Sequence, residues 1–226
     1  MVAGRVQVNG ELADELGMQV DPDEDVVELD GARVRLARPR WIAFHKPVGV
    51  VTTADDPQGR PTVYDALEGA GEGLRYVGRL DLLTEGLIVM TNEGDALHRL
   101  THPSYEIERE YLVKIDGPPA EAPVKLLSGV QLEDGPAQAL QAAWENQDKG
   151  ILRLVIAEGR NREVRRMIAA VGGYVVELKR VRYGPIAMGA LPAGEWRELT
   201  SAEIASIHEA VGGTAGGDER GRSGKT

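Results

Sequence analysis

The sequence predicts an α+β protein in which short strands outnumber helices. Residues 107–115 alternate apolar and polar side chains, which is the period of a half-buried strand. The pair Asp30 and Gly31 separates two apolar runs and is the signal of a two-residue hairpin loop. Helical spacing is found in one later stretch, at Val164, Met167, Ile168 and Val171. A chain of 226 residues can bury a full core, as one large domain or as one domain with a small module.

The composition excludes several classes of protein. There is no cysteine, which excludes disulfides, thiolate zinc sites and cysteine nucleophiles. The sequence contains no run of 18 or more apolar residues and no charged-then-apolar leader, so we expect neither a membrane span nor secretion. The simplest expectation is a cytoplasmic monomer that does not contact a membrane.

Charge is unevenly distributed along the chain. The net charge of −10 argues against a protein that coats nucleic acid by bulk attraction. Residues 151–200 nevertheless hold nine Lys and Arg against five Asp and Glu, whereas residues 41–110 hold six against twelve. Such a basic segment suits local contact with a phosphate backbone, and it equally suits a solvated surface patch. Aromatic residues make up only 4%, so few bases could be stacked at once.

Residues 1–38 are predicted to form a small β module that precedes a main domain at residues 39–211. Residues 5–10 alternate in polarity and end in an Asn-Gly turn, and the Asp30-Gly31 hairpin follows. Residues 212–226 are rich in glycine and polar side chains, and we expect this tail to be disordered.

The first half of the main domain is predicted to combine strands with short helices. Residues 41–44 and 50–53 are apolar runs separated by proline and glycine, as two strands would be. Pro61 favours the first turn of a short helix, and a further apolar strand follows at residues 87–92. Asn92 is placed to cap a helix that runs through Leu100.

The second half is predicted to contain more strands. After the strand at residues 107–115 come a short helix within residues 118–130 and a return strand near residues 137–143. Residues 151–156 form another strand, and the helix that contains Val164 ends at Gly172 and Gly173. A long strand at residues 175–185 and a last helix, which Ser201 is expected to cap and which extends to about Val211, complete the domain.

Asp81 is the acidic residue of greatest interest. It lies between Leu80 and Leu82, one small turn before an apolar strand. A carboxylate flanked by leucines is poorly hydrated, so it needs a cationic partner or is neutralised. The residues alone leave open whether Asp81 is a turn residue or a functional acid.

The surroundings of Asp81 resemble the nucleophile motif of the pseudouridine synthases, in the RsuA/RluB branch of that family. The resemblance is carried by Gly78-Arg79-Leu80-Asp81, Thr84-Glu85-Gly86 and Thr91-Asn92-Glu93-Gly94. Two further family motifs follow in the same order, Glu108-Arg109-Glu110-Tyr111-Leu112-Val113 and Glu158-Gly159-Arg160-Asn161-Arg162-Glu163-Val164-Arg165-Arg166-Met167. Leu83 departs from the pattern, because many relatives carry a polar or acidic residue there. The resemblance extends over roughly residues 41–210.

The resemblance implies a fold, a reaction and a set of residues. The fold is a mixed, largely antiparallel central sheet with flanking helices. The reaction converts a uridine in RNA to pseudouridine without metal or cofactor, on a nucleotide flipped into a pocket. Asp81 would be the nucleophile or base, Tyr111 would pack on the target base with its hydroxyl near the reacting sugar or C5, and Arg165 would hold Asp81. Leu178 would form an apolar wall, and candidate phosphate contacts are Arg79, Arg160, Arg162, Arg180, Arg182 and Lys46.

The resemblance also points to ribosomal RNA as the partner. The Arg-rich motif and the strand Arg180-Val181-Arg182-Tyr183-Gly184 are most similar to the enzymes that act on 23S rRNA, with a 16S rRNA site as the alternative. Residues 4–10 resemble the second half of an alpha-L RNA-binding module whose leading helices are missing. Because residues 1–40 hold nine acidic and five basic residues, we expect a structural remnant rather than an RNA-binding module.

Two other functions are compatible with parts of the sequence. One is a non-catalytic RNA-binding or ribosome-assembly protein with the synthase fold. The other is a metal-dependent phosphodiesterase built on Asp81, Asp95 and His98, although these residues do not form a coherent two-metal set. His98 and His102 have the spacing of two zinc ligands on one helical face, but a third protein ligand is not evident.

Overall fold

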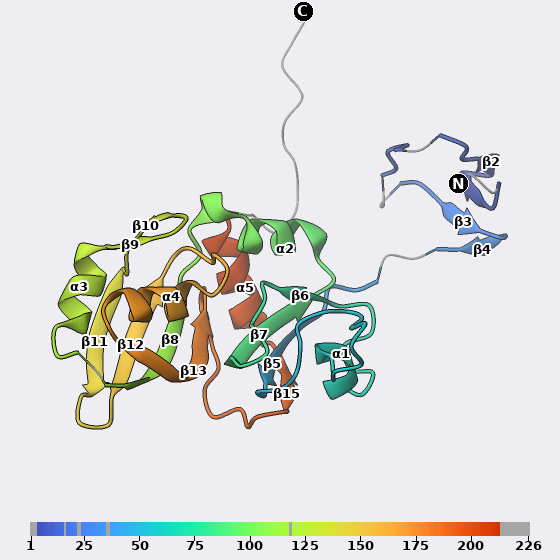
Figure 1. Ribbon diagram of the computed structural model, residues 1–226. Helices are drawn as coiled ribbons and strands as arrows, with labels where there is room; N and C mark the ends of the chain where they lie inside the picture. The colour runs from blue at the N-terminus through green and yellow to red at the C-terminus, as the bar shows by residue number, and fades with distance from the viewer. Residues whose placement is uncertain (1–3, 16, 22–23, 35–36, 118, 213–226) are drawn as a thin grey trace, which may run out of the picture. The chain divides into compact units, whose positions relative to one another are not determined.

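The computed structural model describes residues 4–15, 17–21, 24–34, 37–117 and 119–212, and its contacts divide the chain into two compact units (Figure 1). The units are Met1–Pro39 and Arg40–Thr226. Beyond Gly212, the tail expected to be disordered lies outside the described residues.

The first unit contains a four-stranded antiparallel sheet in the order β2-β1-β3-β4. Its strands are β1 (Val6–Val8), β2 (Glu11–Leu12), β3 (Val27–Leu29) and β4 (Ala32–Arg33). Asp30 and Gly31 join β3 to β4 with φ angles of 52° and 77°. Two successive positive φ angles are those of a type I′ turn, whose twist matches that of the strands. The predicted hairpin is therefore confirmed.

The second unit is built on a nine-stranded sheet in the order β11-β12-β8-β13-β7-β5-β15, with β14 beside β13 and β6 beside β7. The only parallel pair in this sheet joins β13 to β7, and the other pairs are antiparallel. The strands are β5 (Trp41–Lys46), β6 (Arg75–Val77), β7 (Glu85–Thr91), β8 (Arg109–Asp116), β11 (Gln141–Asn146), β12 (Ile151–Ile156), β13 (Tyr174–Tyr183), β14 (Ile186–Ala187) and β15 (Trp196–Glu198). The predicted α+β class with a mixed, largely antiparallel sheet is confirmed.

Helices cover both faces of this sheet (Figure 1). The core of one face includes residues of α1 (Val63–Ala66), α3 (Ala122–Ser128) and α4 (Glu163–Ala170). The core of the other face includes residues of α2 (Gly94–Thr101) and α5 (Ser201–Ala210). Because helices cover both faces, β5 carries apolar side chains on both of its sides. Successive side chains of a strand point to opposite faces, so Ile42 and Phe44 enter one core while Trp41 and Ala43 enter the other.

The helix of the third motif folds as its spacing predicts. Val164, Met167 and Ile168 on α4 are buried, and the helix ends before Gly172, which has a φ of 90°. A short 3₁₀ turn (Pro103–Tyr105) follows α2, and a two-stranded hairpin of β9 (Val130–Leu132) and β10 (Gly135–Ala137) follows α3.

Three local predictions are wrong. Residues 50–53 do not form a strand, because Val51 makes only an isolated bridge to Thr62. Glu93, not Asn92, is the N-cap of α2, since the Asn92 side chain accepts a hydrogen bond from the backbone of Arg40 (2.8 Å). Thr200, not Ser201, caps α5, where it forms a capping box with Glu203.

The helices of the described ranges are too short or too polar for any of them to cross a bilayer.

Candidate active site

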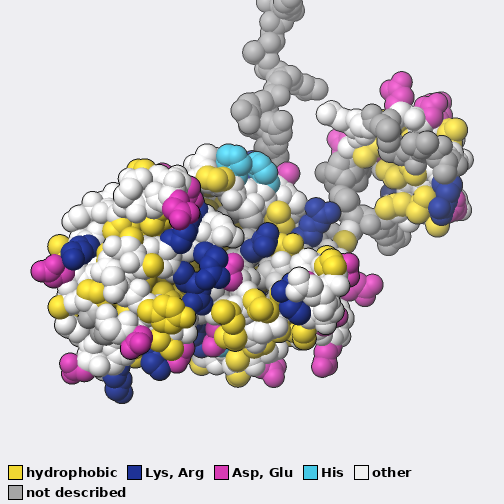
Figure 2. Space-filling view, in the orientation of Figure 1, with side chains coloured by type: hydrophobic (Ala, Val, Ile, Leu, Met, Phe, Trp, Pro, Cys, Tyr) yellow, Lys and Arg dark blue, Asp and Glu magenta, His cyan; other side chains and the backbone are white. Residues whose placement is uncertain are grey.

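A cavity of about 540 Å³ opens in the second unit, where segments distant in sequence converge. Its lining comes from the turn between β6 and β7, from β8 and β13 of the sheet, from α2, and from the loop between β12 and α4. Figure 2 shows basic side chains gathered on the face where α4 and the central strands meet. Asp81, Tyr111, Leu178, Arg79, Arg160, Arg162 and Arg180 all line the cavity.

Asp81 is half-buried in the turn between β6 and β7. The residues on either side of it are fixed through their backbones. The Thr52 hydroxyl donates to the Leu80 carbonyl (2.8 Å) and accepts from the Leu80 amide (3.2 Å). The Leu82 carbonyl accepts from the amide of Gly49 (2.9 Å). Because its neighbours are anchored, Asp81 is held at the cavity wall, and no described residue gives its carboxylate a hydrogen bond or ion pair.

Tyr111 and Leu178 come from the two adjacent strands β8 and β13. Tyr111 lies opposite Arg180 in the antiparallel register, and Leu178 lies opposite Val113. Side chains two residues apart on a strand share a face, so Tyr111, Leu178 and Arg180 form one surface. Tyr111 and Leu178 are mostly buried and line the cavity beside Asp81.

Arg165 contacts the turn that carries Asp81 rather than the carboxylate itself. Its Nη2 donates to the Leu83 carbonyl (2.8 Å), and its Nη1 donates to the Val175 carbonyl (3.3 Å). Burial, and then the charge of Arg162, lowers the pKa of Arg165, whereas the charge of Asp81 opposes this shift. The expected hold of Arg165 on Asp81 stays a prediction: Nη1 and Nη2 are engaged by two carbonyl groups, whereas the buried Nε has no hydrogen-bond partner among the described residues.

Arg79 and Arg162 line the cavity and are exposed. Among the described residues, neither guanidinium has an ion-pair partner. Arg162 also has a φ of 48°, which is uncommon outside glycine. This left-handed conformation at the N-cap of α4 is a local strain of the kind that accumulates at functional sites.

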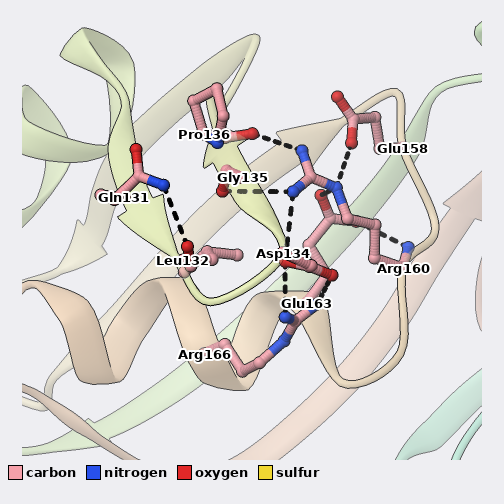
Figure 3. Close-up of polar contacts among 9 residues, drawn as sticks. All are labelled: Gln131, Leu132, Asp134, Gly135, Pro136, Glu158, Arg160, Glu163 and Arg166. Atoms are coloured by element: carbon pink, nitrogen blue, oxygen red, sulfur yellow. Dashed lines mark hydrogen bonds and ion pairs between the residues drawn. The ribbon is translucent and has the colours of Figure 1, made fainter.

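Arg160, which was also expected to contact phosphate, is occupied by protein acceptors (Figure 3). Its guanidinium donates to Glu158, to Asp134 and to the carbonyl groups of Gly135 and Pro136. Arg166 adds two bonds to the same Asp134 carboxylate, of 2.7 and 2.9 Å. Arg160 thus ties the β9–β10 hairpin to the cavity loop, and its expected phosphate contact stays a prediction.

The three remaining residues expected to contact phosphate are Lys46, Arg180 and Arg182. Lys46 is fully buried, its Nζ donates to the carbonyl groups of Pro47 and Val50 (2.8 Å each), and burial lowers its pKa to about 8. Arg180 is only 1% exposed. Arg182 is paired with Glu108 (2.9 Å) and Glu110 (2.8 Å) and does not line the cavity. A phosphate contact needs an accessible cation, and these three are covered or already paired.

Sequence reasoning missed several residues of the cavity wall, among them Thr84 and Arg109. Thr84 is buried there, and its Oγ1 has no hydrogen-bond partner among the described residues. Arg109 is buried and donates to the carbonyl groups of Ile107 and Ala157, which joins the start of β8 to the cavity loop. Both residues fall within the quoted motifs, three positions after Asp81 and two before Tyr111, so motif membership was the signal available.

The residues of the phosphodiesterase alternative are not brought together. Asp95 and His98 are exposed on α2 and do not line the cavity that contains Asp81. His98 and His102 lie with ring centroids 5.3 Å apart. In the part of the chain that the structure describes, no group of three or more His, Cys, Asp or Glu side chains is arranged to hold a metal ion.

Comparison with known proteins places this arrangement in a family. The model of the family described as RNA pseudouridylate synthase matches residues 40–170. A ribosomal large subunit pseudouridine synthase B of Pseudomonas aeruginosa is 42% identical, over 92% of this chain and 56% of its own length. A protein of the same name from Bacillus subtilis is 39% identical, over 89% of this chain and 84% of its own length. A crystal structure of a pseudouridylate synthase is 31% identical, with a TM-score of 0.69, and covers 91% of this chain and 90% of its own. The chain therefore belongs to the RNA pseudouridylate synthase family of enzymes, as its three motifs predicted.

Proposed function

We propose that this enzyme isomerises one uridine of large-subunit ribosomal RNA to pseudouridine, and that Asp81 is the residue that acts on the nucleotide. The observation that carries the proposal is the position of Asp81. Asp81 lines an open cavity from an anchored turn, and a tyrosine and a leucine line the same cavity. The large-subunit target is supported by the names of the relatives from P. aeruginosa and B. subtilis.

The chemistry requires the uridine to leave its stack. In structured RNA, C1′ and C5 of a uridine are covered by neighbouring bases, so the nucleotide has to be flipped into a pocket. A cavity of about 540 Å³ falls within the size range of small-molecule sites, roughly 300–1,000 Å³. The flipped uracil would lie against Leu178 and Tyr111, and Arg79 and Arg162 would contact the flanking phosphates.

The reaction then proceeds without net gain or loss of atoms. Asp81 either adds to the nucleoside or removes the 2′ proton, and the glycosidic bond to N1 breaks. The uracil rotates and forms a new bond from C5 to C1′, after which the proton on C5 is lost and N1 gains one. Tyr111 is our candidate for the group that receives the C5 proton, because it lines the same cavity as Asp81.

Tritium release from C5-labelled rRNA transcripts tests the proposal. We expect release from 23S transcripts by the wild-type enzyme, and loss of release with retained RNA binding in Asp81→Asn. Asp148→Asn is the matched control, because Asp148 is exposed in the turn between β11 and β12. Release that Asp81→Asn leaves unchanged would refute the role of Asp81. Release from 16S rather than 23S transcripts would support the small-subunit alternative, and binding without any release would indicate a non-catalytic protein.

A further inference from the structure

Three exposed aromatic side chains lie next to one another outside both cores. They are His98 on α2, His102 at the C-cap of this helix, and Tyr105 in the 3₁₀ turn that follows. The ring centroids of His98 and His102 are 5.3 Å apart, and those of His102 and Tyr105 are 6.4 Å apart. Figure 2 shows histidine side chains at the surface over α2, on the same face as the basic side chains. The three residues thus form one exposed surface, here called the ring patch.

The helix that carries the ring patch is also a wall of the cavity. Leu97 and Thr101 line the cavity, and each is followed directly by a histidine of the patch. Successive residues of a helix are about 100° apart around its axis, so the two histidines flank the lining residues. The Leu100 carbonyl accepts from the hydroxyl of Tyr183 (2.8 Å), which lines the same cavity. The ring patch therefore borders the cavity on a helix that is anchored to it.

The central ring of the patch has a fixed orientation. Nδ1 of His102 accepts a hydrogen bond from the backbone amide of Ser104 (3.3 Å) and lies 2.7 Å from the Ser104 hydroxyl. A backbone amide can only donate, so the His102 ring is neutral and carries its proton on Nε2. The amide of Tyr105 donates to the His102 carbonyl (3.2 Å). A surface that is already ordered loses little conformational entropy when a ligand packs on it.

The protein makes little other use of these rings. Within the described ranges, the His98 imidazole and the Tyr105 hydroxyl have no hydrogen bond or ion pair. Exposed aromatic residues are scarce in this part of the chain, since Tyr105, Tyr174 and Trp196 are the exposed members among Phe, Tyr and Trp. Of these, Trp196 is covered by the guanidinium of Arg40, 5.7 Å from its ring centroid. A group of three exposed rings beside the cavity is therefore a distinctive feature of this surface.

We propose that the ring patch binds an unpaired base of the substrate RNA, close to the uridine that enters the cavity. This inference rests on the proposed function and adds a contact outside the cavity. Flipping a nucleotide disrupts the stack in which it lay, so a flanking base gains from a new stacking surface. Unpaired bases of RNA are commonly stacked on aromatic side chains, histidine included. Every base has a stacking face, so the contact tolerates different bases.

The charges around the patch favour a base over a phosphate group as the occupant. His102 is neutral in its hydrogen-bonded arrangement. Exposed carboxylates lie at both ends of the patch, since Asp95 is three residues before His98 and Glu106 directly follows Tyr105. Negative charge repels a phosphate but not the face of a base. The accessible arginines of the cavity would hold the backbone, while the ring patch holds a base.

The test measures RNA affinity by filter binding to a 23S rRNA transcript, alongside tritium release from the C5-labelled transcript. Tyr105→Ala removes one ring. His102→Asn removes another, while the amide oxygen of asparagine can still accept from Ser104. We expect each variant to bind the transcript about 5- to 100-fold more weakly, the effect of losing a base-stacking side chain. The slope of log affinity against log salt concentration should not change, because no phosphate contact is lost.

Conservative variants separate the rings from their polar atoms. Tyr105→Phe and His98→Phe keep a ring at each position, so their affinity should stay within about threefold of wild type. Tyr174→Ala is the matched control. Tyr174 is an exposed tyrosine at the start of β13, whereas Tyr183, which contacts α2, ends that strand. Its loss should change RNA affinity by no more than about twofold.

The outcomes distinguish this inference from the proposed function. A wild-type enzyme that releases no tritium would overturn the proposed function itself. Wild-type release, with Tyr105→Ala and His102→Asn binding as tightly as the Tyr174→Ala control, would overturn the ring patch alone. A reduced salt slope in the two ring variants would indicate a phosphate contact and would also overturn the stacking role, as would an equal loss of affinity in Tyr105→Phe. If thermal unfolding shows that either ring variant is not folded, His98→Ala decides by the same criteria.

Discussion

Replacement of Gly86 by alanine tests the packing that places Arg180 beneath the Asp81 turn. Gly86 lies on β7 and pairs with Arg180 across the parallel β7–β13 contact. Its φ is 119°, and a Cβ atom there would stand 2.2 Å from the backbone oxygen and 2.6 Å from the backbone nitrogen of Arg180. These atoms belong to the main chain, so a side-chain rotation cannot relieve the clash.

The cost of Gly86→Ala has two parts. Alanine at this φ costs about 1–3 kcal/mol, and forced separation of the two strands costs a similar amount, about 1–3 kcal/mol. The sum, about 2–6 kcal/mol, is a large part of the 5–15 kcal/mol that typically stabilises a domain. We expect a clear fall in the urea midpoint and a loss of tritium release that exceeds the loss of folded protein.

Gly94→Ala is the matched control for this prediction. Gly94 is the first residue of α2, and an added Cβ atom would meet nothing within 4 Å. We expect its free energy of unfolding to stay within about 0.5 kcal/mol of wild type. If Gly86→Ala unfolds at the same urea concentration as Gly94→Ala, the strands are not held as closely as the structure indicates.

Three further predictions concern the surroundings of Asp81. The pKa of Lys46 is about 8 in the folded protein and near 10.4 when unfolded, so the unfolded state binds more protons between these values. The free energy of unfolding of the wild-type protein, measured by urea titration, should therefore rise as pH increases from 8 to 10. Lys46→Met should lack this rise. An equal change of the free energy of unfolding with pH in both proteins would contradict the prediction. Thr52→Val removes both hydrogen bonds to Leu80 and should lower stability by about 1–3 kcal/mol, measured by urea unfolding with Thr53→Val as control. Arg162→Gln should reduce the slope of log affinity for RNA against log salt concentration by about 0.7–0.9, measured by filter binding, and an unchanged slope would remove Arg162 from the RNA interface.

Much of the fold could be read from local patterns. The Asp30-Gly31 hairpin is encoded by two adjacent residues, and the buried face of α4 is encoded by the spacing of Val164, Met167 and Ile168. Errors arose where tertiary contacts override a local preference. Asn92 has good capping chemistry, but its side chain is used by the backbone of Arg40. Residues 50–53 have the composition of a strand but are not paired in the sheet.

The candidate site divides in the same way. Motif similarity was sufficient to select Asp81, Tyr111 and Leu178, which share one cavity. It was insufficient for the arginines, because the residue type and its place in a motif do not show whether protein acceptors already occupy the guanidinium. Arg160 is occupied by the β9–β10 hairpin and Arg182 by two glutamates, whereas Arg79 and Arg162 are exposed.

The sequence by itself determined the family and the α+β class and singled out Asp81 as the candidate acid, since each depends on residue order or on contacts within one segment. Only the tertiary structure decided which oxygen atoms the nearby arginines contact. The partners of Arg165 and Arg180 are carbonyl groups 82 and 93 positions away in the chain. Which guanidinium reaches which oxygen depends on strand register and on the close approach that Gly86 permits, and neither is encoded locally.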